Sequence, residues 1–94
     1  MPALVRRARS TDSAAAAAVV KAVFDEFGFT WDEFGYHADL RDVEAAYPVF
    51  FVAELEGRIV GTAGFSTRGS LERLYVLRAA RGTGVGSALL AAVV

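Results

Sequence analysis

The sequence predicts one α/β (α+β) domain, in which a mostly antiparallel sheet is flanked by helices in the order β-α-α-β-β-β-α. Three observations lead to this prediction. The chain has 94 residues, which is enough for one domain and no more. Apolar residues recur at helical spacing over residues 13–27, whereas residues 49–77 form β-rich runs divided by turns. A glycine-rich loop at residues 82–86 then leads into a last apolar segment.

The composition excludes several classes of protein. With 54 % hydrophobic residues, the chain is too apolar to be disordered. Its net charge of −1 gives no basic field for nucleic acid or an anionic membrane, so we expect neither partner. No run of residues reaches the ~20 apolar positions that a membrane span needs. The lack of cysteine favours a cytoplasmic protein, and a single histidine, His37, leads us to expect no metal site.

Residues 3–28 are predicted to form a short strand and a helix. The strand covers residues 3–8, and the Ser-Thr-Asp triplet at 10–12 supplies N-cap residue types for a helix over residues 13–27. Gly28 is a natural stop for that helix. The apolar side chains that share one face of the helix are Ala16, Val20, Val23, Phe24 and Phe27.

A second helix is predicted over residues 36–47, and Pro48 ends it. We expect His37 to occupy an ordinary polar position on this helix. The side chains expected to face the core are those of Leu40, Val43 and Tyr47.

The next part of the chain predicts strands. Residues 49–55 and 58–65 are β-rich and are joined by the turn signal Glu56-Gly57, so they predict a hairpin. Residues 71–77 predict a further strand, and residues 87–94 a closing helix.

Two groups of side chains have two interpretations each. The aromatic residues after the first helix either pack in the core or line a substrate lid; we expect core packing for Phe24 and Phe27, and leave both interpretations open for Trp31, Phe34 and Tyr36. Four carboxylates in the same region either attract a cationic amine or form a solvated helix face. They are Asp32, Glu33, Asp39 and Asp42.

The glycine-rich loop is typical of a phosphate site. Glycines let a backbone approach a ligand closely, and the first turn of a helix offers unpaired N–H groups and a partial positive charge. Arg81 adds a fixed charge with several donors. A Walker loop is excluded because the loop contains no lysine, and a dinucleotide fingerprint is disfavoured because its third glycine falls on Ser87.

The loop and its surroundings resemble those of the GNAT acetyltransferases. Arg81-x-x-Gly84-x-Gly86 matches the (Q/R)-x-x-G-x-(G/A) signature of that family, and Arg78 with Arg81 resembles its R-x-x-R-G variant. The segment Leu74-Tyr75-Val76 resembles the fourth strand of the family, and the order of elements agrees over nearly the whole chain.

The resemblance implies an N-acetyltransferase that uses acetyl-CoA, without a metal, to acetylate an amine on a small molecule or peptide. It implies that the Arg81 side chain flanks the pyrophosphate and that backbone groups of Val76 and Leu77 pair with the pantetheine arm. It implies further that the phosphates are held by the backbone amides of Gly82, Thr83, Gly84, Val85 and Gly86. The family transfers acetyl directly to the amine, without a covalent enzyme intermediate.

The sequence departs from the family pattern at its end. The family continues with a fifth strand and a fourth helix, so we expect residues 1–94 to be a single partial domain, truncated before the fifth strand. Residues 71–77 would then form an exposed sheet edge, through which we expect homodimerisation. The alternative to catalysis is a CoA-binding or self-associating half-domain.

A general base has one candidate of the kind that some family members use, a glutamate on the fourth strand. Glu72 is the only carboxylate on the predicted strand. Similar sequences often carry that glutamate two residues earlier, where this chain has Ser70, and a bulge in the strand is one way to shift the facing. The alternative is a solvated charge beside Arg73.

Overall fold

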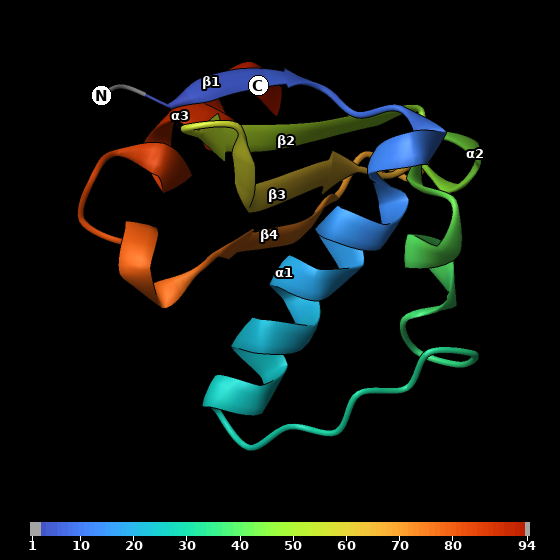
Figure 1. Cartoon of the computed structure of the whole chain (residues 1–94). Helices are drawn as coiled ribbons and strands as arrows, with labels where there is room; N and C mark the ends of the chain where they lie inside the picture. Colours follow the sequence, from blue (N-terminus) through green and yellow to red (C-terminus); the bar gives the residue numbers. More distant parts are fainter. Residues whose placement is uncertain (1–2, 94) are drawn as a thin grey trace.

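The computed structural model describes residues 3–93. Four antiparallel strands form one sheet in the order β1-β2-β3-β4, and helices cover both of its faces (Figure 1). The strands are β1 (Leu4–Arg7), β2 (Val49–Leu55), β3 (Arg58–Phe65) and β4 (Leu71–Val76). The predicted fold class and order of elements are confirmed.

Helix α1 (Ser13–Glu26) packs on one face of the sheet and α3 (Val85–Val93) on the other, where Figure 1 shows it behind the strands. The side chains of β2 alternate between these two layers. Phe50 and Val52 lie in the core under α1, whereas Phe51 and Ala53 lie in the core under α3. Because successive side chains of a strand point to opposite faces of the sheet, one set of apolar side chains packs under α1 and the other under α3.

The predicted second helix is interrupted. A 3₁₀ turn covers Ala38–Arg41, and α2 covers only Val43–Ala46. Asp42 stands between them in an extended conformation and accepts a hydrogen bond from the N–H of Ala45, as an N-cap does. The prediction of one continuous helix was wrong because this cap starts a new helix, but the three side chains expected in the core are buried: Leu40, Val43 and Tyr47.

The predicted hairpin is confirmed, since β2 and β3 pair and Glu56 and Gly57 both have positive φ at its turn. Strand β4 contains a bulge, because its register against β3 shifts by one residue between Thr62 and Gly64. At the bulge Arg73 has a φ of 56°. Its carbonyl accepts a hydrogen bond of 2.7 Å from the buried hydroxyl of Thr62.

Within residues 3–93, no helix combines the length and the apolarity needed to cross a membrane.

Candidate functional site

The glycine loop lies where β4 ends and α3 begins. A 3₁₀ turn at Arg78–Ala80 leads into the loop, and Val85 opens the helix. Ala80 and Val85 are buried at the two ends, whereas the residues between them are exposed. The hydroxyl of Thr83 donates to the carbonyl of Ala80 and so turns inward. The loop is thus anchored at both ends and presents its backbone outward.

The backbone amides of this loop have unused hydrogen-bonding capacity. The first bond of α3 runs from the N–H of Ala88 to the carbonyl of Gly84. In the described part of the chain, no hydrogen bond uses the N–H groups of residues 82–87. Several N–H groups at the positive end of a nine-residue helix are therefore left without an acceptor among the described residues. This is an arrangement suited to an anion.

The three glycines keep that region open. Gly82 and Gly84 have φ angles of 81° and 86°, a conformation that L side chains rarely adopt, and a Cβ on either would meet no atom within 4 Å. Gly86 has no such restriction, and its nearest neighbour would be a methyl group of Val76 at 3.8 Å. None of the three is needed for close packing inside the protein, so their small size serves the space outside it.

Arg81 is held beside the loop by protein groups. Its two terminal nitrogens each donate 2.7 Å hydrogen bonds to the carboxylate of Glu26, and its Nε donates to the carbonyl of Val76 at 3.1 Å. The hydrogen bond from Arg81 is the main cause that holds the pKa of Glu26 below its usual value. Arg81 lies at the loop, as the sequence predicted, but its guanidinium is hydrogen-bonded to Glu26 and Val76 of the protein itself.

Val76 and Leu77 differ in whether their backbone N–H groups are available to a ligand. The N–H of Leu77 donates to the carbonyl of Val60 at 2.8 Å, so it is already paired with β3. In an antiparallel ladder the next residue points its N–H and carbonyl the other way. The backbone of Val76 therefore faces outward from the edge of β4. The N–H of Leu77 is thus engaged by the protein, and the pairing of backbone groups of Val76 and Leu77 with a pantetheine arm stays a prediction.

A groove of about 750 Å³ runs from Arg81 along this edge of β4. Its walls are mostly apolar and come from the end of α1, the segment after it and β4. The lining residues are Val23, Phe24, Phe27, Phe29, Tyr36, Leu74, Tyr75, Val76 and Arg81.

A polar hollow adjoins the groove, and both share Tyr36 and Tyr75. Glu72 lines the hollow on the same side as Tyr75, although a regular strand would place residues three apart on opposite faces. The bulge in β4 accounts for this placement, because it adds one residue between the two side chains. The carboxylate of Glu72 has one charged neighbour, Arg68, at 3.9 Å.

Asp39 is the other carboxylate in this hollow, and it is fully engaged. Arg73 donates to both of its oxygens at 2.8 and 3.0 Å, and the hydroxyl of Tyr47 donates to one of them. Burial alone would raise the pKa of Asp39, but these hydrogen bonds keep it below its usual value. Burial and the bond to Asp39 raise the pKa of Tyr47. Neither group is suited to accept a proton at neutral pH.

Three of the four carboxylates of the acidic region have structural partners. Asp32 accepts hydrogen bonds from the N–H groups of Gly35 and Tyr36, Asp42 caps α2, and Asp39 binds Arg73. Asp32, Glu33 and Asp42 are exposed to solvent, and attraction of a cationic amine by this region stays a prediction.

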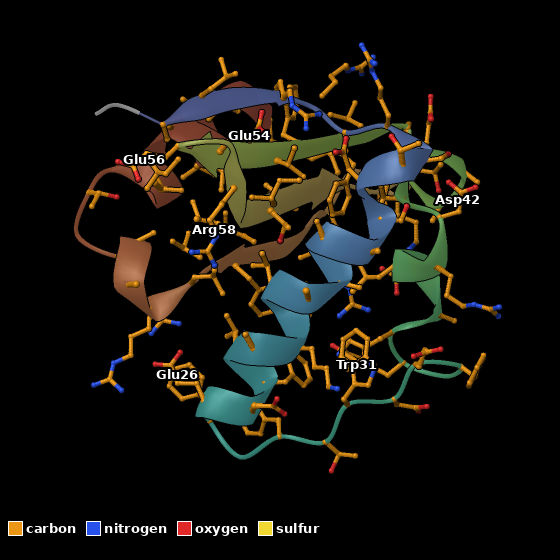
Figure 2. The ribbon with its side chains drawn as sticks, viewed as in Figure 1. Glu26, Trp31, Asp42, Glu54, Glu56 and Arg58 are labelled. Carbon is orange, nitrogen blue, oxygen red and sulfur yellow. The ribbon has the colours of Figure 1, made fainter. Side chains whose placement is uncertain are left out.

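The aromatic residues divide differently from the expectation. Phe27 is 58 % exposed, so its expected core position was wrong; it lies at the C-terminal end of α1, where the sheet no longer covers the helix. Phe34 and Tyr36 are exposed as well. Phe24 and Trp31 are partly buried and pack against the core under α1 (Trp31 is labelled in Figure 2).

His37 is buried, whereas an ordinary polar position was expected. Its ring stacks on Trp31 at 4.2 Å and meets Phe24 edge-on at 4.4 Å. Nδ1 accepts a hydrogen bond from the N–H of Asp32 at 3.0 Å, so the proton of the neutral ring is on Nε2. Burial, followed by the charge of Arg73, lowers the pKa of His37.

Sequence reasoning missed Glu26 and the pairing of Arg73 with Asp39. A signal for Glu26 was present: α1 ends on Asp25 and Glu26, although negative charge is unfavourable at the C-terminus of a helix. An unfavourable charge at that point indicates a cationic partner elsewhere in the fold. No comparable signal marked Arg73. Among the described residues, no three His, Asp or Glu side chains cluster as a metal site would require.

Comparisons with known proteins agree with this geometry. The model of the acetyltransferase (GNAT) family matches residues 16–94. The structure is similar to a GNAT-family acetyltransferase from Staphylococcus aureus, with a TM-score of 0.85 and 21 % identity over 97 % of this chain and 62 % of that chain. No curated protein sequence matches the chain.

Two further solved structures contain ligands. A GNAT-family acetyltransferase from Brucella melitensis, in complex with acetyl-CoA, is 27 % identical over 94 % of this chain and 63 % of that chain, with a TM-score of 0.73. AAC(6')-Iy, in complex with the bisubstrate analogue CoA-S-monomethyl-acetylneamine, has a TM-score of 0.73 and 24 % identity over 99 % of this chain and 69 % of that chain. The chain thus spans less than two thirds of the length of the first two of these proteins and 69 % of the third.

Proposed function

Because the chain belongs to the acetyltransferase (GNAT) family, we propose that it binds acetyl-CoA and transfers the acetyl group to an amine. The observation that carries this proposal is the cluster of N–H groups at residues 82–87, which have no acceptor in the described part of the chain and open onto glycines. These amides suit the pyrophosphate of CoA, a negatively charged group rich in acceptor oxygens. The related complex with acetyl-CoA supports the choice of ligand.

The rest of the donor fits along β4. The outward N–H of Val76 is available to a carbonyl of the pantetheine arm, which would extend the sheet as an added strand. The apolar groove beside it would hold the reacting end of the donor, away from water. The carbonyl of Val76 is already bound to Nε of Arg81, so the N–H is the group that we assign to the arm.

The reaction that we propose joins an amine nitrogen to the carbonyl carbon of the acetyl group. The carbon–sulfur bond breaks, CoA leaves as the thiolate, and the amine gives up a proton. Glu72 is the candidate to receive this proton, directly or through a water, because the other carboxylate in the hollow is bound to Arg73. The protein otherwise contributes by orienting the two reactants.

The acceptor that we propose is an amine on a small molecule or peptide. The bisubstrate analogue bound to AAC(6')-Iy supports this class, because it joins CoA to an acetylated amine. A cytoplasmic location stays a prediction from the absence of cysteine.

The proposal includes self-association through β4. Within residues 3–93, β4 pairs on one side with β3 and with no strand on the other. Leu71 and Leu74 on this strand are more than one third exposed. An apolar edge of this kind pairs readily with another chain, so a homodimer, or a self-associating module without catalysis, is the second candidate.

An acetyl-transfer assay tests the activity. The protein would be incubated with acetyl-CoA and a panel of primary amines and peptides, and the acetylated product and released thiol would be measured by mass spectrometry and a thiol reagent. We expect turnover with at least one amine and a loss of about 100-fold in kcat/KM for Glu72→Gln, the scale of general base catalysis. Glu33→Gln, a charge-matched change on an exposed residue, is the control. Equal rates for wild type and Glu72→Gln would exclude Glu72 as the base.

A further inference from the structure

A two-pronged ion pair joins the glycine loop to the end of α1. The terminal nitrogens of Arg81 bind the two oxygens of Glu26 at 2.7 Å each, and Nε binds the carbonyl of Val76 at 3.1 Å. The guanidinium also lies 5.7 Å from the ring centre of Phe27. One side chain of the loop therefore holds α1 and β4 at the same time. Figure 2 shows Glu26 at the C-terminal end of α1, on the side of this loop.

The local electrostatics explain why Glu26 binds there. The C-terminal end of a helix carries a partial negative charge, and α1 has no basic residue in its last turn. Glu26 and Asp25 add negative charge at this end. Arg81, 55 positions along the chain, supplies the missing positive charge. The hydrogen bond from Arg81 lowers the pKa of Glu26, so the carboxylate stays ionised at neutral pH.

The donors of Arg81 are mostly in use. A guanidinium has five N–H groups, and three of them bind Glu26 and Val76. The fork that would bind a phosphate with two parallel bonds is the one that holds the carboxylate. The amides of residues 82–87 have no such competitor among the described residues.

We propose that Arg81 and Glu26 are positioning residues for the anion site. Their ion pair fixes the loop against α1 and β4, and the backbone amides alone hold the phosphates. The inference rests on the proposed function and differs from the role that family resemblance implied for Arg81. It makes Glu26 a residue that supports donor binding from a distance.

A double-mutant cycle tests the proposal. The Kd for acetyl-CoA would be measured by calorimetry for wild type, Glu26→Gln, Arg81→Gln and the double variant, at low and high salt. We expect each single variant to raise Kd about threefold to tenfold, the scale of one well-formed charged contact, and the double variant to raise it no further. The dependence of Kd on salt should be the same in all four proteins. In steady state KM for acetyl-CoA should rise while kcat stays constant.

Two further substitutions separate the effect of charge from the effect of position. Arg81→Lys keeps the charge but loses the fork and the bond to Val76, so it should bind acetyl-CoA as weakly as Arg81→Gln. Asp25→Asn removes the same charge as Glu26→Gln from the neighbouring exposed position, and it should bind as wild type does. Recovery of affinity in Arg81→Lys would show that charge, and not position, is what Arg81 supplies.

A mechanism in which Arg81 binds the phosphates itself predicts the opposite change in acetyl-CoA affinity for Glu26→Gln. If Arg81 is a phosphate ligand and Glu26 competes for it, Glu26→Gln will bind acetyl-CoA more tightly than wild type, and Arg81→Gln will weaken the salt dependence. That result overturns the proposal. The ion pair can also be measured without a ligand, from the NMR signals of the terminal N–H groups of Arg81, which bind Glu26, and from urea unfolding. Non-additive loss of stability with no acetyl-CoA binding in wild type would support the ion pair and contradict the proposed function.

Discussion

At the scale of single residues, His37 makes the stability of the fold depend on pH. The neutral ring accepts a hydrogen bond from Asp32 and is packed between aromatic rings. Protonation would break that bond and place a charge among apolar groups near Arg73. Because the folded pKa lies below the unfolded value of about 6.5, the stabilising contribution is complete above that pH and is lost as the pH falls through the folded pKa.

We therefore expect urea unfolding to show lower stability at pH 5.5 than at pH 7.5. His37 is the only histidine in the chain, so a His37→Gln variant should lose most of this dependence even if it is less stable at both pH values. A wild-type stability that is constant, or higher at pH 5.5, would contradict the burial of a neutral ring.

The sequence predicted single residues well where one local rule decides their position. Gly82 and Gly84 adopt the positive φ angles that glycine favours, and Val43 and Leu40 are buried as their spacing required. The sequence did not predict the positions of side chains that depend on a partner far away in the chain. The burial of His37 depends on Trp31 and Phe24, and the position of the Arg81 side chain depends on Glu26.

At the scale of elements, β4 combines two properties that compete with each other. Its outward edge is the surface that we assign to the pantetheine arm, and it is also the surface through which a second copy would pair. The bulge at Arg73 sets the direction of this edge, and it is supported by the hydroxyl of Thr62 and by the ion pair with Asp39.

We expect the wild-type protein to form dimers in sedimentation experiments at high concentration. Leu74→Lys places a charge on the exposed edge of β4 and should shift the equilibrium to monomer. Leu4→Lys makes the same change on β1, the opposite edge of the sheet, and should leave the dimer intact. A strictly monomeric wild type, or equal effects of the two substitutions, would contradict pairing through β4.

Element boundaries were predictable where a turn or cap stands in the sequence. Glu56-Gly57 placed the hairpin, and Gly28 followed the end of α1. The break at Asp42 was missed, although aspartate is a typical N-cap, because the apolar spacing continues across it. A bulge in β4 was considered only because of the direction in which Glu72 would point. Its position at Arg73 could not be predicted, because the register of a strand depends on its partner strand.

At the scale of the whole molecule, the proposed donor site joins parts that are far apart in the chain. Residues 82–87 would supply amides, Val76 the edge of the sheet, and Glu26 the support from the other layer. The groove then continues between α1 and β4 towards the hollow that contains Glu72. These contacts depend on the sheet order and on both helical layers, so sequence alone located the loop but not its neighbours.

Calorimetric titration measures whether the N-terminus of α3 binds the pyrophosphate of acetyl-CoA. Gly86 is the position to change, because its φ is not restricted and a side chain there meets only Val76 at 3.8 Å. Gly86→Ala should keep binding to within a fewfold, whereas Gly86→Asp places a carboxylate at the anion site and should abolish it. NAD and ATP serve as control ligands.

We predict that wild type and Gly86→Ala bind acetyl-CoA, that Gly86→Asp does not, and that neither control ligand binds comparably. Equal binding of acetyl-CoA by Gly86→Asp and wild type would show that the pyrophosphate does not bind at the N-terminus of α3.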